Sequence, residues 1–362
     1  MLYLAIDQHS KQLTVNLRDE AGDVRLRRQV STKRMGMEEF GQQLAAYGEP
    51  YVAIVEVCGF NDWLLQWLPQ HGCQEIVLVQ PGHRSKKKTD YRDANALGEL
   101  LWINRQRLLG GQRVQGLRRV QISSPQDQAD RQLTALRHVA ACRKTRCTNR
   151  IHHLLRRYNF EQDCPTKGMH TIKARKWLRQ LSLPILDRLE LNQQLDQWDL
   201  CLLQLADLDA QIAERHAQSK SAQRLTTLMG FGAYSALALA ARIGDISRFQ
   251  RPRSLANYFG LTPGCRNSGD VKQRLGSITK EGSALARFLL GQMVVHLLKR
   301  DAWMRAWYLR IKKRRGSKIA RVAVMRRMTT IIWHMLTHDE PYQPGGGGRT
   351  RARRQAQRVQ PA

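Results

Sequence analysis

Hydrophobic residues in the first hundred positions follow the patterns of β-strands, separated by stretches with helical spacing. The strand patterns cover residues 2–6, 13–17, an alternating stretch from Val24, 51–57 and 75–79. Glu20-Ala21-Gly22-Asp23 supplies a turn between the second and third stretches, which predicts a hairpin meander. A helical pattern over 37–47 then leads into the fourth stretch. Three meandering strands followed by alternating helix and strand predict an α/β domain of RNase H-like arrangement, although many α/β folds share parts of it.

The middle of the chain, from about residue 125 to 217, has helical spacing without strands. Apolar residues recur at steps of four and three in two sets: Leu133, Leu136, Ala140, Cys147, Ile151, Leu154 and Tyr158, then Leu191, Leu195, Trp198, Leu202, Leu205 and Ile212. Asp209 occupies one position in the second of these apolar series. A segment with Pro165 and Gly168 separates the two helices. The pattern predicts a helical hairpin or coiled-coil arm that serves spacing or dimerisation. The first helix also carries cations suited to a phosphate backbone: Arg137, Arg143, Lys144, Arg146, Arg150, Arg156 and Arg157.

From about residue 225 the pattern is helical, and basic residues gather toward the end. They are Lys299, Arg300, Arg305, Arg310, Lys312, Lys313, Arg314, Arg315, Lys318, Arg321, Arg326 and Arg327. Trp303, Trp307 and Tyr308 are interleaved with them, which favours a nucleic-acid surface over a solvated helix face. Beyond Pro344, four glycines and an Arg-rich stretch predict a disordered basic tail.

Composition strengthens the expectation of an anionic partner. The chain has 60 Lys and Arg against 30 Asp and Glu, a formal charge of +30, which predicts polyanion binding rather than mere solubility. No apolar stretch is long enough to span a membrane, and the first residues show no leader pattern, so we expect a cytoplasmic protein without membrane contact that associates with the nucleoid when bound to DNA. The seven cysteines form no C-x-x-C pair and are expected to be reduced thiols.

Four carboxylates stand where buried structure is expected. Asp7 directly follows one apolar run, and Glu56 interrupts another. Asp90 and Asp93 are three apart and share a face if a helix begins near Thr89. Taken singly, the first two could be strand ends that reach solvent, and the others could be acids that suit a helix dipole.

Together the four carboxylates predict a metal centre. Acidic residues on neighbouring strands and on one helix face can converge, and close carboxylates raise one another's pKa unless a cation neutralises them. Oxygen ligands without His or Cys partners suit Mg²⁺ or Mn²⁺ rather than zinc. Such a site can activate an attacking oxygen and stabilise a leaving one during phosphodiester cleavage.

A serine in the C-terminal half is a second candidate. Ser268 stands in the polar segment Arg266-Asn267-Ser268-Gly269, expected to be a loop between helices. An exposed serine there can act as a nucleophile, but a structural role in the turn is the commoner one. Gly230-Phe231-Gly232 resembles the hairpin of a helix-hairpin-helix, whose amides can receive a DNA phosphate; a plain interhelical turn is the alternative.

Four short motifs in this order resemble one family. They are Ala5-Ile6-Asp7, Glu56-Val57-Cys58-Gly59, Lys88-Thr89-Asp90-Tyr91-Arg92-Asp93-Ala94, and the block from Gly260-Leu261-Thr262-Pro263 to Ser268-Gly269. The chain resembles DEDD-type insertion-sequence transposases of the insertion-sequence-110 group, RNA-bridged recombinases that include relatives of pilin-gene invertases. Phe60-Asn61-Asp62 departs from the commoner family wording, which leaves the contacts of that loop open.

The resemblance implies a fold, a mechanism and partners. It implies a RuvC-like metal-binding domain over 1–106, a linker and helical coiled-coil arm over 107–220, a mainly helical transposase domain over 221–340, and a basic tail over 341–362. Asp7, Glu56, Asp90 and Asp93 would hold Mg²⁺ or Mn²⁺, and Ser268 would form a covalent phosphoserine intermediate with DNA. Donor and target DNA, a noncoding bridge RNA and a homo-oligomer, from dimer to tetramer, would be the partners. A water-using Holliday-junction-type nuclease and a nonenzymatic architectural DNA-binding protein are the alternatives.

Overall fold

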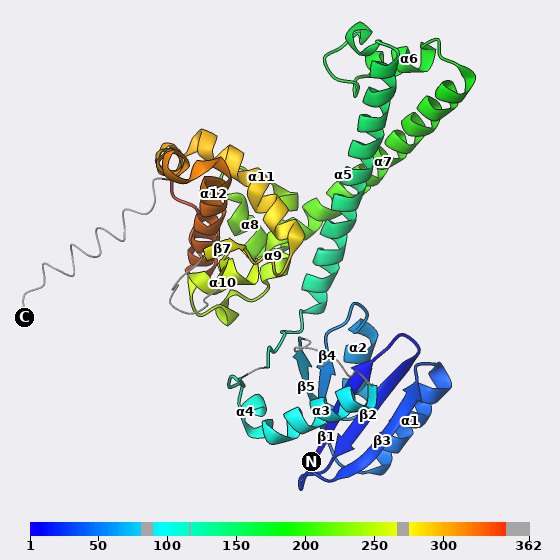
Figure 1. Cartoon of the computed structure of the whole chain (residues 1–362), viewed down its shortest axis with the longest axis vertical. Coiled ribbons are helices and arrows are strands. Elements are labelled where there is room, and N and C mark those ends of the chain that lie inside the picture. The colour runs from blue at the N-terminus through cyan, green and yellow to red at the C-terminus, as the bar shows by residue number, and fades with distance from the viewer. Residues whose placement is uncertain (81–89, 116, 266–274, 345–362) are drawn as a thin grey trace, which may run out of the picture. The chain divides into compact units, whose positions relative to one another are not determined.

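The computed structural model describes residues 1–80, 90–115, 117–265 and 275–344 (Figure 1). The chain divides into two compact units, Met1–Ile122 and Ser123–Ala362. Within the described residues, no helix combines the length and apolar character that crossing a bilayer requires. Ser268 and the Arg-rich end lie outside the described residues.

The first unit is built on a five-stranded mixed sheet in the order β3-β2-β1-β4-β5. Strand β1 pairs antiparallel with β2 and parallel with β4; β2–β3 is antiparallel and β4–β5 parallel. The strands are β1 (Leu2–Gln8), β2 (Gln12–Arg18), β3 (Val24–Ser31), β4 (Tyr51–Glu56) and β5 (Cys73–Val79). The helices are α1 (Arg34–Ala46), α2 (Asp62–Gln70), α3 (Asp90–Ile103) and α4 (Arg105–Leu109). This arrangement is consistent with the expected RNase H-like fold.

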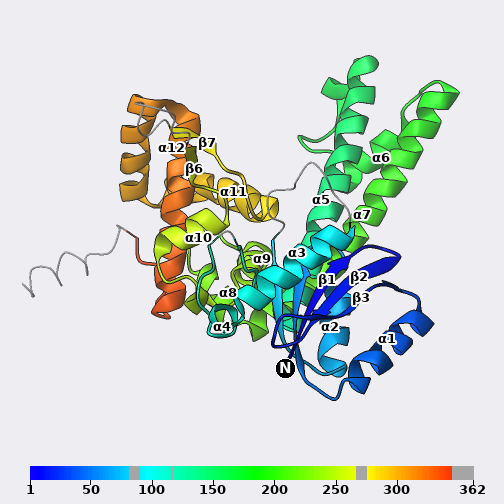
Figure 2. The same ribbon diagram turned by 60° about the horizontal axis from the view of Figure 1, so that its bottom comes forward.

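Apolar runs in β1 and β4 arise because the sheet is covered on both faces (Figure 2). Alternate residues of β1, such as Leu4 and Ile6, pack with α1 and α2, whereas Tyr3 and Ala5 pack beneath α3 and α4. A later segment adds to the sheet edge, because the Val120 amide donates to the carbonyl of Leu78 at 2.7 Å. The compact unit thus continues beyond residue 106 to Ile122.

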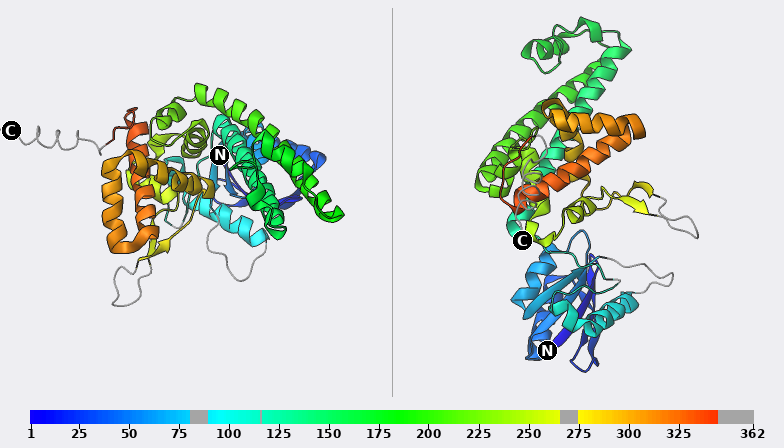
Figure 3. Two further views of the ribbon diagram at one scale, coloured as in Figure 1. Left: turned by 90° about the horizontal axis from the view of Figure 1, so that it is seen from above. Right: turned by 90° about the vertical axis from the view of Figure 1, so that its left-hand side faces the viewer.

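The second unit begins with a long helical hairpin. Helices α5 (Pro125–Arg157) and α7 (Ile185–Gln218) run side by side, and α6 (Ile172–Gln180) lies at their far end (Figures 1 and 3). Leu191, Leu195 and Trp198 of the second apolar series are buried in the core shared with α5. Leu136 is instead 51% exposed, so the predicted stripe on α5 does not face the partner helix along its whole length.

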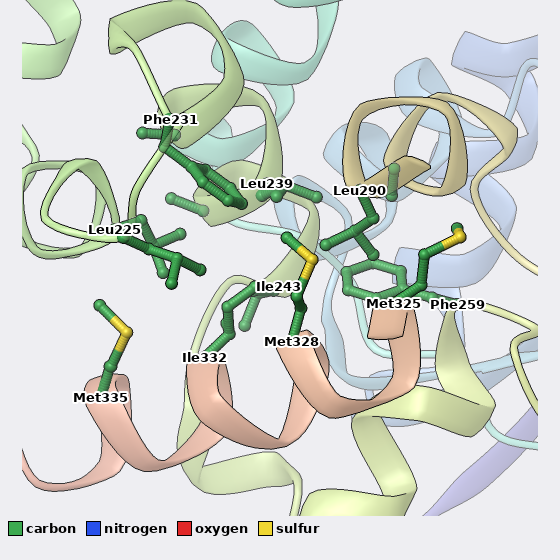
Figure 4. Close-up of a cluster of buried hydrophobic side chains, with 14 of the residues drawn as sticks. Leu225, Phe231, Leu239, Ile243, Phe259, Leu290, Met325, Met328, Ile332 and Met335 are labelled. Carbon is green, nitrogen blue, oxygen red and sulfur yellow. The ribbon is translucent and has the colours of Figure 1, made fainter. Parts of the chain in front are cut away.

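The remaining helices enclose an apolar core. They are α8 (Lys220–Thr226), α9 (Ala233–Ile243), α10 (Pro252–Tyr258), α11 (Ala284–Arg300) and α12 (Ala302–Thr337), with short 3-10 turns η1 (Glu161–Asp163) and η2 (Ile246–Arg248) elsewhere in this unit. Phe231, Leu239, Leu290 and Met328 meet at its centre (Figure 4). Gly230-Phe231-Gly232 lies between α8 and α9, and the Phe231 side chain is buried in this core. Phosphate binding by this segment stays a prediction.

Two short strands, β6 (Pro263–Cys265) and β7 (Leu275–Ile278), pair antiparallel on either side of the segment that contains Ser268. We expected only a loop between helices there. The strands have three and four residues and contain proline and glycine, so they leave no alternating pattern to find.

A close backbone crossing anchors these strands. Gly260 has a φ of +65°, and a Cβ there would stand 2.2 Å from the carbonyl oxygen of Glu281. Gly282 has a φ of +74°, and its Cβ would stand 2.1 Å from the carbonyl oxygen of Tyr258. Only residues without a side chain fit this crossing.

We expect Gly260→Ala to destabilise the second unit by roughly 3 kcal/mol or more, because left-handed strain adds to a clash with backbone. Urea unfolding followed by circular dichroism would measure the loss of stability. Gly264→Ala is the matched control: its Cβ would make an ordinary 3.7 Å contact with the Ser277 carbonyl oxygen, so the midpoint should barely change. Equal midpoints for the two variants would contradict the proposed crossing constraint.

Candidate metal centre at the ends of β1 and β4

Asp7 and Glu56 lie on neighbouring strands at the same edge of the sheet. Strands β1 and β4 are parallel, and their register pairs Ile6 with Val55, so Asp7 and Glu56 follow at adjacent positions. Both Cβ positions face α3, because the residues two positions earlier on each strand belong to the core beneath that helix. Asp7 is only 5% exposed, and Glu56 is half-buried.

Helix α3 carries the other two predicted carboxylates, Asp90 and Asp93, in its first turn. A polar cluster fixes the helix on β2: the Arg18 guanidinium donates to the side-chain oxygens of Asn16 at 3.2 Å and Asn95 at 3.0 Å. The Asn16 amide also donates to Asn95 Oδ1 at 3.3 Å. These bonds join strand and helix, so they help to set the position of the acidic turn.

Gly98 allows the close approach of α3 to β2. A Cβ at this position would stand 2.7 Å from Oδ1 of Asn16. A larger residue would therefore displace either the asparagine or the helix.

His9 joins two of the predicted carboxylates, although the sequence pattern predicts oxygen ligands without a histidine partner. Its Nε2 lies 3.3 Å from Oδ2 of Asp7 and 3.4 Å from Oδ1 of Asp90. Among the residues that the structure describes, Asp7, His9 and Asp90 form the group whose ligand atoms all lie within 4.8 Å of one another. Glu56 and Asp93 are outside this group, although Glu56 neighbours Asp7 along the sheet.

The loop after Glu56, whose contacts the sequence left open, is tied to β1. The Asn61 side chain is buried, and its Nδ2 donates to Oε1 of Gln8 at 2.7 Å and to the Glu56 carbonyl at 3.1 Å. Its Oδ1 accepts from the Cys58 amide at 2.5 Å. One asparagine therefore links the ends of β1 and β4, next to Asp7 and Glu56.

A buried hydroxyl opposite Asp7 is independent support for a polar ligand at this site. Thr14 pairs with Asp7 in the antiparallel register of β1 and β2, which directs both side chains to the same face. Its Oγ1 is buried and has no hydrogen-bond partner in the described part of the chain. Two carboxylates, an imidazole and an unsatisfied hydroxyl form a donor set that fits a hydrated divalent cation.

The helical unit carries the basic surface that the sequence predicted. Between residues 284 and 337 the chain has thirteen Lys and Arg and a single acidic residue, Asp301. Asp301 is buried, and its carboxylate accepts from the Met304 amide and from the Tyr342 hydroxyl. The exposed cations of α11 and α12 are Lys299, Arg300, Arg305, Arg310, Lys312, Lys313, Arg314, Arg315, Lys318, Arg321 and Arg326. Arg327 stacks over exposed Trp303 at 5.1 Å.

The cations predicted along α5 divide into two groups. Four form ion pairs within the chain: Arg137 with Asp209, Arg150 with Glu190, Arg156 with Glu161, and Arg157 with Asp187. The other three remain candidates for phosphate contact: Arg143 and Arg146 are exposed, and Lys144 is half-buried. The nucleic-acid surface on this helix is therefore smaller than its composition indicated.

Comparison with known proteins identifies the family. A profile for transposases of the DEDD, IS110 type matches residues 4–160, and a profile described as "Transposase IS116/IS110/IS902 family" matches 222–309. The transposase for insertion sequence element IS1111A of Coxiella burnetii is 26% identical over 345 residues, which cover 90% of this chain and 87% of the relative. The "Probable family 20 transposase" of Pseudomonas aeruginosa is 26% identical over 94% of this chain and 98% of its own length.

A shorter similarity links the chain to a gene-inverting protein. The pilin gene-inverting protein of Moraxella bovis is 28% identical over 123 residues, 33% of this chain and 38% of that protein. The two matched profiles cover both the strand-rich unit with the carboxylates and the helical region that contains Ser268. The chain therefore belongs to the DEDD transposases of the IS110 type, as its motifs predicted.

Proposed function

We propose that this transposase cleaves and exchanges DNA strands with a divalent cation held by Asp7, Glu56, Asp90 and Asp93, and with Ser268 as the nucleophile. The observation that carries the proposal is that Asp7 from β1 and Asp90 from α3 lie close together. A carboxylate oxygen of each approaches Nε2 of His9. Carboxylates from separate elements are costly to bring together without a cation, which supports metal binding at this place.

The cation, Mg²⁺ or Mn²⁺, would neutralise charge on the scissile phosphate and lower the pKa of the attacking hydroxyl. Asp7 is buried at the strand end and would provide a fixed anchor. Glu56 and the α3 aspartates are more exposed and would complete the site on the side open to substrate. Asn61 and the Asn16–Arg18–Asn95 cluster would hold these carboxylates in position through their backbone elements.

Ser268 would divide strand exchange into two transfers. Its Oγ would form a bond to a DNA phosphorus while one bond from that phosphorus to a DNA oxygen breaks, and the serine proton would pass to that leaving oxygen. A hydroxyl of another strand would then attack the phosphoserine and release the serine, so the number of phosphodiester bonds is conserved. Paired strands β6 and β7 support this role, since they anchor both flanks of the segment that contains the serine.

The partners follow from charge and resemblance. The basic surface of α11 and α12 suits the phosphates of donor and target DNA. A bridge RNA encoded by the element would select the sites, and two to four copies of the chain would bring metal centres and serines together, with the α5–α7 hairpin as a coiled-coil arm.

We expect DNA affinity to fall roughly 10³-fold between 50 and 200 mM salt, the scale for six or more phosphate contacts. Replacing Lys312, Lys313, Arg314 and Arg315 by glutamine should reduce the slope of log K against log salt by about 0.9 for each cation that neutralises a phosphate. Fluorescence anisotropy on a short duplex would measure both effects. Arg156→Gln with Arg157→Gln is the matched control, because these cations already form ion pairs within the chain. A flat salt response would contradict the basic surface.

The test of the whole proposal is a reaction with the DNA that flanks the gene, Mg²⁺ and copurified RNA. Recombinant junctions together with a protein–DNA adduct would support strand exchange through serine. Nicked products with free ends and no adduct would favour a water-using junction nuclease. Binding without any cleavage under these conditions would favour an architectural protein.

A further inference from the structure

We propose that His9 is a nitrogen ligand of the cation at Asp7 and Asp90, and that it makes this centre prefer Mn²⁺ to Mg²⁺. The inference rests on the proposed metal site and adds to it a ligand outside the four carboxylates.

The spacing of the three side chains is that of ligands around one ion. In an octahedral site with bonds of about 2.1 Å, neighbouring ligands lie roughly 3.0 Å apart. Nε2 of His9 lies 3.3 Å from Asp7 Oδ2 and 3.4 Å from Asp90 Oδ1, close to that value. The ligand atoms of all three side chains lie within 4.8 Å of one another, so a contraction around an ion would bring them into coordination.

A hydrogen bond from His9 Nε2 to Oδ2 of Asp7, at 3.3 Å, accounts for only part of this arrangement. Both aspartates approach the same ring nitrogen, and an imidazole nitrogen carries at most one hydrogen. Charge-assisted N–H to carboxylate bonds are normally about 2.7–2.9 Å long, shorter than either contact. One nitrogen facing two carboxylate oxygens at these lengths also suits a cation shared by all three side chains.

The backbone fixes the histidine where a ligand is needed. The His9 amide donates to the Gln12 carbonyl at 2.9 Å, which closes the turn from β1 to β2. The Thr32 hydroxyl also bonds the Ser10 carbonyl at 3.1 Å, and the Thr32 amide bonds that of Lys11 at 3.0 Å. The imidazole belongs to a turn that backbone hydrogen bonds hold in place, two residues after Asp7. Metal binding would therefore remove little conformational freedom from it.

A nitrogen ligand changes which ions bind well. Mg²⁺ prefers oxygen ligands, whereas imidazole suits first-row transition metals. Mn²⁺ accepts both nitrogen and carboxylate oxygen in octahedral geometry, so two aspartates with His9 suit it better than they suit Mg²⁺. Thr14 would add a hydrogen bond to a water on the ion, since its buried hydroxyl pairs in register with Asp7.

Pulsed electron paramagnetic resonance of Mn²⁺ bound to the full chain tests the ligand directly. We expect a ¹⁴N coupling of a coordinated imidazole, its replacement by a ¹⁵N coupling when the protein contains ¹⁵N-histidine, and its disappearance in His9→Ala. The labelling arm needs no substitution and shows that a histidine coordinates the ion even if that variant folds poorly; among the residues that the structure describes, His9 is the histidine grouped with Asp7 and Asp90.

Titration of both metals tests the preference. In His9→Ala we expect Mn²⁺ affinity to fall roughly tenfold or more, the scale for removing a ligand or the group that supports one, while Mg²⁺ affinity changes by less than about threefold. Lys11→Ala, on the same turn, should leave both affinities unchanged. Equal decreases for the two metals would overturn the preference.

Asp7→Asn separates this inference from the proposed function. Mn²⁺ binding that requires Asp7 but shows no histidine coupling would overturn the role of His9 and leave the carboxylate site standing. Failure of the native chain to bind Mn²⁺ in an Asp7-dependent manner would overturn both.

Discussion

Asp7→Asn is expected to reduce strand cleavage by roughly 10³-fold or more, the decrease typical of removing a principal electrostatic stabiliser of a transition state. Asparagine keeps the size of the side chain but removes the charge that would hold the cation at the end of β1. Asp7 is 5% exposed at the end of a buried strand, so its charge is held at a fixed position. Single-turnover cleavage of end-labelled flanking DNA with saturating Mg²⁺ and RNA would measure the rate.

Glu99→Gln is the matched control for this variant. Glu99 also lies in the first unit, on α3, but it is exposed and away from the acidic first turn. It should cleave at nearly the native rate, and both variants should retain native circular dichroism and DNA affinity. Cleavage by Asp7→Asn within a few-fold of native would remove this carboxylate from the chemistry.

Ser268→Ala is expected to abolish the covalent protein–DNA adduct and to reduce strand exchange by roughly 10⁴-fold or more, as when a catalytic nucleophile is removed. DNA binding should persist, because the hydroxyl supplies chemistry rather than much contact area. Denaturing gels of radiolabelled DNA, followed by mass spectrometry of the adducted peptide, would measure the product and its site.

Ser277→Ala is the control for the serine assignment, since Ser277 is exposed on β7 of the same strand pair. It should form the adduct at the native rate. Full recombination by Ser268→Ala would reject the assignment, and continued cutting without an adduct would indicate hydrolysis by water.

The sheet was predictable because strands buried on both faces, or alternating across one, leave regular apolar patterns. Those patterns also identified Asp7 and Glu56 as neighbours, since parallel strands end at one edge. The position of Asp90 was harder to predict from the sequence, because it depends on how Arg18 and Asn95 join β2 to α3. Such contacts between distant residues have no period in the sequence.

His9 was missed for a related reason. It lies just past the end of β1, where the alternation that assigns residues to faces has stopped. The sequence signal that could have found it is its place two residues after Asp7, a spacing that keeps side chains on one side of extended backbone. The β6–β7 pair was missed because strands of three and four residues are too short to show a pattern.

Gly98 affects the distance between Asp7 and Asp90. Gly98 lies eight residues after Asp90, roughly 12 Å along the helix axis. A methyl group there would stand 2.7 Å from Oδ1 of Asn16, so either the Asn16 side chain or α3 itself would have to move. Movement of α3 would shift Asp90 relative to Asp7, which is fixed in the sheet. The distance between Asp7 and Asp90 is thus adjustable from a position that contacts neither aspartate, and homologues with a larger residue there would need a smaller partner on β2 to keep the same distance.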